Sequence, residues 1–326
     1  MKVFVFSLRN YDEKAFLEKF CEKYNIEFGY TNETPCLENV HLAAGYDAVD
    51  IITTPTSAEV IDKYHEMGIK CIATRTIGFD HIDYKHAASL GIGVVNISYS
   101  PATVADFTVM MMLMGLRKVK YIKLRADVQD YSLEGKIARE LPQCTVGVIG
   151  TGRIGQTVIQ DLSGFGCKIL ANDPNPKDSL GDNVEYVDLD TLIRESDIIT
   201  LHAPAFDSTY HMLDEAAFAK MKDGVGIVNC ARGSLIDTEA LIENLDNGKV
   251  GFACLDVIEN EGSLFYFNRM GEPLGNHDLA ILESYPNVIV MPHMAFYTDE
   301  AVSNMVENSL LGIKEYFETG KCVNIK

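Results

Sequence analysis

The run Gly150-Thr-Gly-Arg-Ile-Gly155 is placed where a glycine-rich turn can bind a pyrophosphate. An apolar strand-like run, 145–149, precedes it, and a helix-like segment, 156–162, follows it. A second apolar run, 168–172, then ends at Asp173. A strand, this turn, a helix, a strand and an acid about twenty residues on together indicate a dinucleotide site, whereas the glycines alone would fit any strand-to-helix turn. The glycines let the backbone approach the pyrophosphate at a helix N-terminus.

Asp173 also indicates which dinucleotide is bound. A carboxylate at this place accepts hydrogen bonds from the ribose hydroxyls of NAD, and it would repel the 2′-phosphate of NADP. No arginine directly follows it. The sequence therefore predicts NAD as cofactor.

Two further strand-like runs end in side chains that suit carbonyl chemistry, Arg232 and His293. Ligands bind at the carboxyl ends of strands in an open α/β sheet, so both side chains can face one crevice. An arginine there can hold a carboxylate and polarise a neighbouring carbonyl. If Glu261 contacts His293, it stabilises the imidazolium that would donate a proton to a ketone oxygen. The plain alternatives are a surface arginine, a structural histidine and a solvated acidic loop at 256–261.

In the first third of the chain, Ala73-Thr-Arg-Thr-Ile-Gly78 ends a strand-like run in glycine. The backbone N–H groups of Ile77 and Gly78 could bind a carboxylate, although a simple turn explains the stretch equally well. The sequence has no cluster with metal-ligand spacing and no motif of a covalent nucleophile, so we expect no metal site.

The elements that must position these residues form two α/β patterns. The first hundred residues predict an open parallel sheet with strands at 2–7, 48–53, 70–74 and 94–97. A long helix is expected from Ala102 to about Lys120, and from Thr145 the pattern restarts with six parallel strands of a doubly wound fold. The last helix, 298–319, is expected to pack on the first domain. We therefore predict a domain of 1–100 plus 298–326, interrupted by a nucleotide-binding domain at 101–297.

Composition limits the function classes. The chain has 326 residues, 47% hydrophobic and 23% charged, which is ordinary for a globular protein. Its net charge of −19 argues against nucleic acid or an acidic membrane surface as partner, and no apolar run is long enough to span a bilayer. Eight scattered cysteines, without CxxC spacing or an export signal, favour a reducing cytoplasm.

Along essentially its whole length the chain resembles the D-isomer-specific 2-hydroxyacid dehydrogenases, and most closely their D-lactate dehydrogenase branch, which includes the enzymes of vancomycin resistance. The resemblance is carried by Thr145–Gly155 and by five further segments: Arg75–Asp83, Tyr99–Asp106, Asn229–Gly233, Leu255–Glu261 and Pro292–Thr298. It implies a Rossmann NAD-binding domain inserted into a flavodoxin-like substrate domain.

The resemblance also implies a role for each matching residue. The catalytic residues would be Arg232 on the carboxylate and carbonyl, His293 as general acid, and Glu261, rather than Glu259, as its partner. The cofactor would contact Gly150, Gly152, Arg153, Ile154, Gly155, Asp173, Ala203, Pro204, Thr209, Cys230, Ala231 and Asp256, the last through its carboxamide. The substrate would contact Ile77, Gly78, Tyr99, Arg232 and Phe296, with Tyr297 beside them.

The implied reaction is NADH-dependent reduction of a small 2-oxo acid to the D-2-hydroxy acid, with pyruvate favoured. The alternative is a larger acid such as 2-oxoisocaproate, because Ile51-Ile-Thr-Thr54 lies where the lactate branch often carries an aromatic residue. Phosphoglycerate dehydrogenase is a weaker match. From another class, NAD-sensing co-repressors share this fold. A homodimer is expected, since the helix from Ala102 carries more Met and Leu than one face requires.

Overall fold

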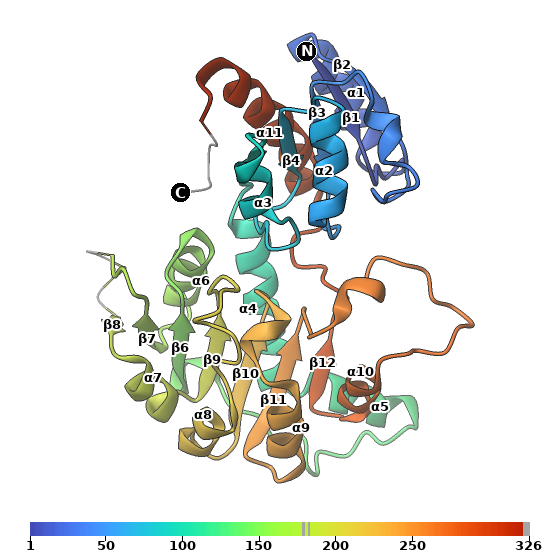
Figure 1. Cartoon of the computed structure of the whole chain (residues 1–326). Helices are drawn as coiled ribbons and strands as arrows, with labels where there is room; N and C mark the ends of the chain where they lie inside the picture. The colour runs from blue at the N-terminus through green and yellow to red at the C-terminus, as the bar shows by residue number, and fades with distance from the viewer. Residues whose placement is uncertain (178–179, 182, 322–326) are drawn as a thin grey trace. The chain divides into compact units, whose positions relative to one another are not determined.

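The computed structural model describes residues 1–177, 180–181 and 183–321, and the chain divides into two compact units. Unit 1 is Met1–Ser100 with Tyr297–Lys326, and unit 2 is Pro101–Phe296. Cys322 and the end of the expected first domain, 322–326, lie outside the described residues. Each unit is an α/β layer structure whose helices cover both faces of one parallel sheet (Figure 1).

The sheet of unit 1 has the strand order β2-β1-β3-β4-β5, which is the flavodoxin-like order. All of its neighbouring strands are parallel. The strands are β1 (Lys2–Val5), β2 (Glu27–Tyr30), β3 (Ala48–Ile51), β4 (Cys71–Thr74) and β5 (Gly93–Val95). The helices are α1 (Lys14–Tyr24), η1 (Val40–Ala43), α2 (Ala58–Glu66), α3 (Tyr84–Ser89) and α11 (Asp299–Thr319).

Helix α11 completes unit 1, although it comes from the far end of the chain (Figure 1). Thr298 caps its first turn by accepting a hydrogen bond from Ala301 N. Val306, Leu310 and Ile313 are fully buried in one core cluster with strand residues of β1, β3, β4 and β5. Gly93 is required beneath this helix, because a Cβ there would lie 2.2 Å from the ring of Tyr316.

The sheet of unit 2 has seven parallel strands in the order β12-β11-β10-β9-β6-β7-β8. The strands are β6 (Thr145–Ile149), β7 (Lys168–Asn172), β8 (Val184–Tyr186), β9 (Ile198–Leu201), β10 (Val225–Asn229), β11 (Val250–Leu255) and β12 (Val288–Val290). Strands β6 to β11 form the doubly wound order of a Rossmann domain. The expected count of six was one too low, although a strand was expected at 288–291, where β12 pairs with β11 at the edge of the sheet.

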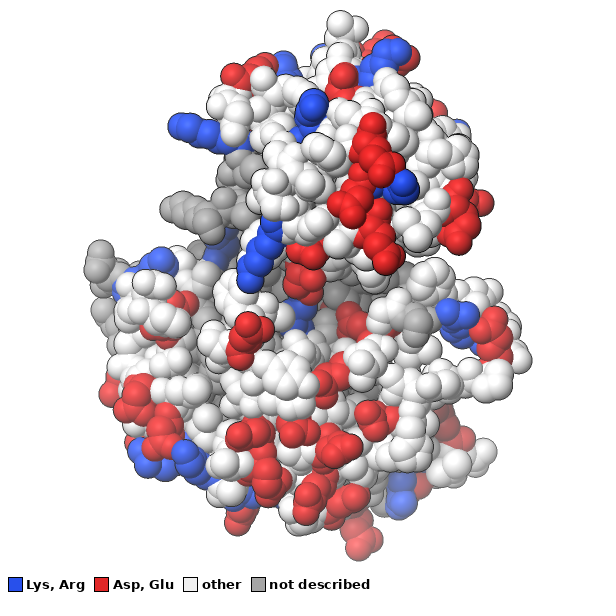
Figure 2. Space-filling model, viewed as in Figure 1, with Lys and Arg blue, Asp and Glu red and all other residues white. Residues whose placement is uncertain are grey.

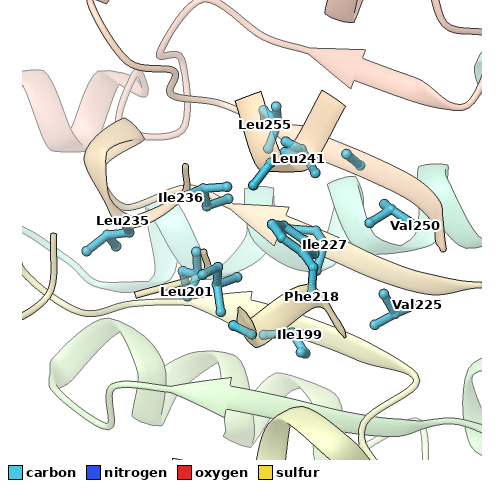
Figure 3. Close-up of a cluster of buried hydrophobic side chains, with 14 of the residues drawn as sticks. Ile199, Leu201, Phe218, Val225, Ile227, Leu235, Ile236, Leu241, Val250 and Leu255 are labelled. Carbon is cyan, nitrogen blue, oxygen red and sulfur yellow. The ribbon is translucent and has the colours of Figure 1, made fainter. Parts of the chain in front are cut away.

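The helices of unit 2 cover both faces of its sheet. They are α4 (Ala102–Leu116), α5 (Val119–Asp127), η2 (Leu141–Gln143), α6 (Arg153–Ser163), α7 (Leu189–Glu195), α8 (Glu215–Lys220), η3 (Gly233–Leu235), α9 (Thr238–Asp246), η4 (Glu261–Ser263) and α10 (His277–Ser284). On one face, side chains of β9, β10 and β11 meet Phe218 of α8 and Leu241 of α9 in a closed apolar cluster (Figure 3). Each such side chain stabilises the unit by about 1.5–3 kcal/mol.

The single helix expected from Ala102 to Lys120 is two helices. The first helix, α4, ends at Leu116, and the second, α5, begins at Val119. Between them, Lys118 has a left-handed backbone with a φ of 56°. Most of α4 is buried, whereas none of the residues of α5 is. The break therefore separates a core helix from a surface helix.

None of the helices in the described residues is long and apolar enough to cross a bilayer. Acidic side chains outnumber basic ones on the face shown in Figure 2, in keeping with the net charge of −19. An anionic ligand must therefore be bound by local donors, because the overall field repels it.

Candidate active site

The glycine turn between β6 and α6 has the shape that a pyrophosphate requires. Gly150 has a φ of 92°, and a Cβ there would lie 2.7 Å from the backbone of His202. A Cβ on Gly155 would lie 2.0 Å from Gly150 O, so the helix packs directly on the turn. Gly152 has open space where a Cβ would be, and it is the N-cap of α6. These residues fit a dinucleotide phosphate at a helix N-terminus, and Arg153 and Ile154 begin that helix.

Asp173 follows β7 and is tied to the same turn. Its Oδ2 accepts a hydrogen bond from Thr151 N at 2.7 Å, and its Oδ1 accepts one from Asn175 N at 2.7 Å. Burial raises the pKa of Asp173, but these backbone hydrogen bonds outweigh it and hold the pKa below its ordinary value. The side chain is thus an ionised acceptor, as the ribose hydroxyls of NAD require.

The loop after β9 carries three further residues expected at the cofactor. Ala203 follows His202, and Thr209 closes the loop by donating from Oγ1 to Pro204 O at 2.7 Å. Sequence reasoning missed His202. Burial lowers its pKa to about 4, so it is neutral near pH 7, and its Nε2 lies 3.0 Å from Thr200 Oγ1. Cys230 and Ala231 follow β10, and burial raises the pKa of the Cys230 thiol.

Arg232 stands between β10 and the short helix η3. Its carbonyl accepts a hydrogen bond from Asn229 Nδ2 at 2.8 Å, and its Nη1 donates to Ala231 O at 2.8 Å. Gly233 lets this turn pack on the segment before Glu261, since a Cβ there would lie 2.1 Å from the Ile258 carbonyl carbon. The guanidinium is thereby held at the carboxyl end of a central strand.

His293 and Glu261 are paired, as expected from the resemblance. His293 Nδ1 lies 2.6 Å from Glu261 Oε1, and both side chains are about one-fifth exposed. Glu261 is itself fixed, because its Oε2 accepts a hydrogen bond from Ile258 N at 2.9 Å. His293 has a left-handed backbone with a φ of 55°, and it follows β12. The pair can hold a proton next to a reacting oxygen.

Asp256 accepts hydrogen bonds from the backbone on both sides of the His293 side chain. It is fully buried, and its two oxygens accept hydrogen bonds from Met294 N at 2.7 Å and Ala295 N at 2.9 Å. Its backbone carbonyl accepts from His293 N at 2.8 Å. Burial raises the pKa of its carboxyl. The bonds show that Asp256 shapes the loop after β12; the expected contact with the carboxamide stays a prediction.

The residues expected at the substrate, apart from Arg232, are divided between the two units. Phe296 ends unit 2, with its ring 6.1 Å from the His293 ring. Tyr266, which sequence reasoning did not assign, lies 5.5 Å from the same ring. Ile77, Gly78 and Tyr99 belong to unit 1, so their approach to the other residues stays a prediction.

The Thr76–Gly78 loop is held in place by hydrogen bonds to two of its carbonyls. Asn96 Nδ2 donates to Ile77 O at 2.6 Å, and Thr76 Oγ1 donates to Gly78 O at 2.6 Å. Both carbonyls are therefore engaged by side chains of unit 1. Within the described residues, the N–H groups of Ile77 and Gly78 donate no hydrogen bond to another backbone group. A carboxylate bound to them stays a prediction.

A second histidine–carboxylate pair uses another acid of the 256–261 loop, Glu259. His211 Nε2 is 2.7 Å from Glu259 Oε1, and Glu259 Oε2 accepts from Thr238 Oγ1 at 2.7 Å. Asp256, Glu259 and Glu261 thus each accept hydrogen bonds or pair with a histidine inside the protein. The 256–261 loop is therefore not simply a solvated acidic loop. No sequence spacing signals this pair. In the described part of the chain, no group of three or more His, Cys, Asp or Glu residues could hold a metal ion.

Comparison with known proteins assigns the family. Residues 109–295 match the model of the D-isomer-specific 2-hydroxyacid dehydrogenase NAD-binding domain. The chain is 44% identical to an aromatic 2-oxoacid reductase of Clostridium sporogenes, over 99% of this chain and 98% of that one. It is 39% identical to a D-lactate dehydrogenase of Lactiplantibacillus plantarum, over 98% of each chain.

A solved structure, that of a D-2-hydroxyisocaproate dehydrogenase, superposes with a TM-score of 0.87 and 36% identity over 98% of each chain. Fold, NAD-binding domain and relatives all agree with the expectation from the sequence. The chain therefore belongs to the D-isomer-specific 2-hydroxyacid dehydrogenases, the NAD-dependent oxidoreductases that act on the CH–OH group of D-2-hydroxy acids.

Proposed function

We propose that this chain reduces 2-oxo acids with an apolar side chain to D-2-hydroxy acids, with Arg232, Glu261 and His293 as its catalytic residues. The observation that carries the proposal is the 2.6 Å contact between His293 Nδ1 and Glu261 Oε1, in the unit that also holds Arg232 and the glycine turn. A proton donor, a carboxylate-binding cation and a dinucleotide turn together suit carbonyl reduction.

Each side chain has one task in this reaction. NADH, when bound, supplies the hydride that adds to the carbonyl carbon. Arg232 would bind the carboxylate of the 2-oxo acid and stabilise the negative charge that develops on its carbonyl oxygen. His293 would give that oxygen a proton, and Glu261 would hold the imidazole ring and stabilise its protonated form. The N–H groups of Ile77 and Gly78 would add donors to the carboxylate.

The side chain of the preferred acid is proposed to be larger than the methyl group of pyruvate. At the end of β3, Ile51 and Thr54 are buried within unit 1, so Ile52 and Thr53 are the residues that can contact a ligand. An aliphatic or small residue there leaves more room than the aromatic residue expected of the lactate branch. The relative named an aromatic 2-oxoacid reductase, at 44% identity, supports the same choice.

Pyruvate is the second candidate. The D-lactate dehydrogenase at 39% identity favours it, and so does the resemblance of the sequence to the lactate branch. 2-Oxoglutarate would need a second cation for its distal carboxylate in addition to Arg232, which makes that acid a poorer candidate.

The test is NADH oxidation with pyruvate, 2-oxoisocaproate, phenylpyruvate and 2-oxoglutarate side by side, followed by chiral analysis of the products. We expect D-products, with a higher kcat/KM for 2-oxoisocaproate or phenylpyruvate than for pyruvate. A preference for pyruvate would select the D-lactate dehydrogenase candidate. NADH binding without turnover on any of the four acids would favour an NAD-sensing co-repressor instead.

A further inference from the structure

Three ionisable side chains meet inside the core of unit 1, and none of the three was given a task in the reaction above. Arg75, Glu13 and Asp50 are all 0% exposed. Arg75 Nε donates to Glu13 Oε1 at 3.0 Å, and its Nη1 lies 3.3 Å from Asp50 Oδ1. Its Nη2 donates to Phe6 O at 3.1 Å. A buried guanidinium thus connects β4, β3, β1 and the segment before α1.

This cluster is a poor device for stability alone. Ionised groups lose their hydration when they are buried, and well-packed apolar residues are often as stable in their place. Here the pairing is imperfect, because Arg75 Nη1 and Asp50 Oδ1 form an ion pair at 3.3 Å that does not have the geometry of a hydrogen bond. The ionic groups therefore call for a role in addition to packing.

Arg75 is joined directly to the loop that would receive the substrate carboxylate. Arg75 directly follows β4, and its backbone N donates to Ile51 O at 2.9 Å. The next three residues, Thr76–Gly78, form the loop whose carbonyls are engaged by Thr76 and Asn96. Because the Arg75 side chain is held by Glu13, the start of this loop is fixed relative to the core.

Glu13 extends the network in the other direction. Its Oε2 accepts a hydrogen bond from Arg9 N at 3.0 Å, and its Oε1 is 3.3 Å from Arg9 Nη2. Arg9 Nε donates to Asp12 at 2.9 Å, and Asp12 Oδ2 accepts a 2.7 Å hydrogen bond from Tyr297 Oη. Tyr297 is the first residue of the segment that returns to unit 1. One chain of polar contacts therefore runs from the loop to this segment.

We propose that Glu13 is a positioning residue. It holds Arg75, and through Arg75 it keeps the N–H groups of Ile77 and Gly78 in the geometry that binds the carboxylate of the 2-oxo acid. Arg9, Asp12 and Tyr297 hold Glu13 in place from the other side. The inference rests on the proposed function, since it takes that loop as the carboxylate site. Glu13 itself touches neither substrate nor cofactor.

The test is Glu13→Gln, which keeps the shape of the side chain and removes its charge. The KM for pyruvate and the KM for phenylpyruvate should rise by the same factor, about tenfold, because both acids share the carboxylate. The kcat and the Kd for NADH should change by less than about threefold. Hydrogen exchange of the 76–78 segment, followed by mass spectrometry, should become faster.

Glu307→Gln is the matched control. Glu307 pairs with Lys23 between α11 and α1 of the same unit, so the control makes the same charge change away from the loop. It should leave both KM values and the exchange of 76–78 unchanged. Tyr297→Phe removes only the hydroxyl that reaches Asp12, and it should reproduce the Glu13→Gln effects at about two- to threefold.

Two results would overturn the proposal. One is a lower Tm for Glu13→Gln with unchanged KM and unchanged exchange, because the network would then only stabilise the unit. The other is a change in KM for one acid alone, which would indicate a side-chain effect. If Glu13→Gln does not fold, the hydrogen exchange of 76–78 in Tyr297→Phe decides, because Tyr297 is also expected beside the substrate and the KM of that variant alone does not separate the two roles. Absence of wild-type turnover on any 2-oxo acid would defeat the proposed function, while the exchange experiment still decides on the network.

Discussion

His293 has one ring nitrogen held by Glu261 at 2.6 Å, so its other ring nitrogen is the atom that can serve a substrate oxygen. We expect His293→Ala to lower kcat by about 10²- to 10⁴-fold, the usual contribution of a general acid. NADH binding should change little, because the glycine turn and Asp173 remain. Steady-state kinetics and NADH fluorescence titration measure the two effects.

His86→Ala is the control for this prediction. His86 also contacts a carboxylate, Asp62 Oδ1 at 2.7 Å, but on the surface of unit 1. It should retain wild-type kinetics. Near-native turnover in His293→Ala would mean that another group donates the proton.

Ile52 tests the proposed preference for larger acids. An aromatic ring at this half-buried position should occupy the space that a large substrate side chain needs. We expect Ile52→Tyr to lower the kcat/KM ratio of phenylpyruvate to pyruvate by about tenfold or more, since pocket contacts of this size are worth about 1–3 kcal/mol. Leu42→Tyr, at an exposed apolar position of the same unit, should leave the ratio unchanged. An unchanged ratio in Ile52→Tyr would place the specificity elsewhere.

At the same scale, the sequence predicted those residues whose position is set by local rules. The glycines of 150–155 and Asp173 follow from the strand–turn–helix–strand pattern. The Glu261–His293 contact followed only from the family resemblance, since 32 positions separate the two residues. Nothing local could predict that Glu259 binds His211, because that contact depends on how three loops pack together.

Elements were predictable where burial makes a simple pattern. The strands of a covered parallel sheet are continuous apolar runs, so most were found within one or two residues. Strand β2 was missed because it is an edge strand without a buried residue, and its sequence, Glu27–Tyr30, has no such run. The break between α4 and α5 was missed because neither Gly nor Pro marks Lys118, whose left-handed backbone is set by packing.

Strand β3 carries a buried carboxyl whose titration should be measurable. Burial raises the pKa of Asp50 from 3.8 to about 6, although Arg75 opposes the shift. Between these values the folded chain holds a proton that the unfolded chain has released, so Asp50 destabilises the fold as pH rises. Asp50→Asn lacks this titration. Its free energy of unfolding, relative to wild type, should therefore rise from about pH 4 to about pH 7, by at most about 3 kcal/mol.

Urea unfolding of both proteins across that pH range measures this difference. Glu66→Gln, at the exposed end of α2, is the control, and its difference from wild type should be flat by comparison. A difference for Asp50→Asn that is constant with pH would show that folding does not raise the pKa of Asp50.

At the scale of the whole molecule, the sequence predicts a homodimer from the apolar helix that begins at Ala102. In the structure the exposed apolar surface lies mainly on α5 and the segment after it. The Met-rich helix α4 is mostly covered within unit 2, as a core helix is. Met110 of α4 is exposed, but most of the large apolar side chains exposed in this region lie on α5 and the segment after it: Val119, Ile122, Leu124, Val128, Tyr131, Leu133 and Ile137. Leu133 and Ile137 are 88% and 86% exposed. Such a concentration of exposed apolar residues marks an interaction surface.

A pocket of about 590 Å³ lies beside this segment and is lined in part by Leu116, Tyr121, Ile137 and Phe252. We propose that a second copy of the chain covers this surface. Light scattering should give twice the mass of the chain, and Leu133→Lys with Ile137→Lys should give the mass of one chain, because two buried charges would oppose association. Leu37→Lys, at a half-exposed position of unit 1, should remain dimeric. A monomer mass for the wild-type protein would exclude the dimer and leave the apolar segment for another partner.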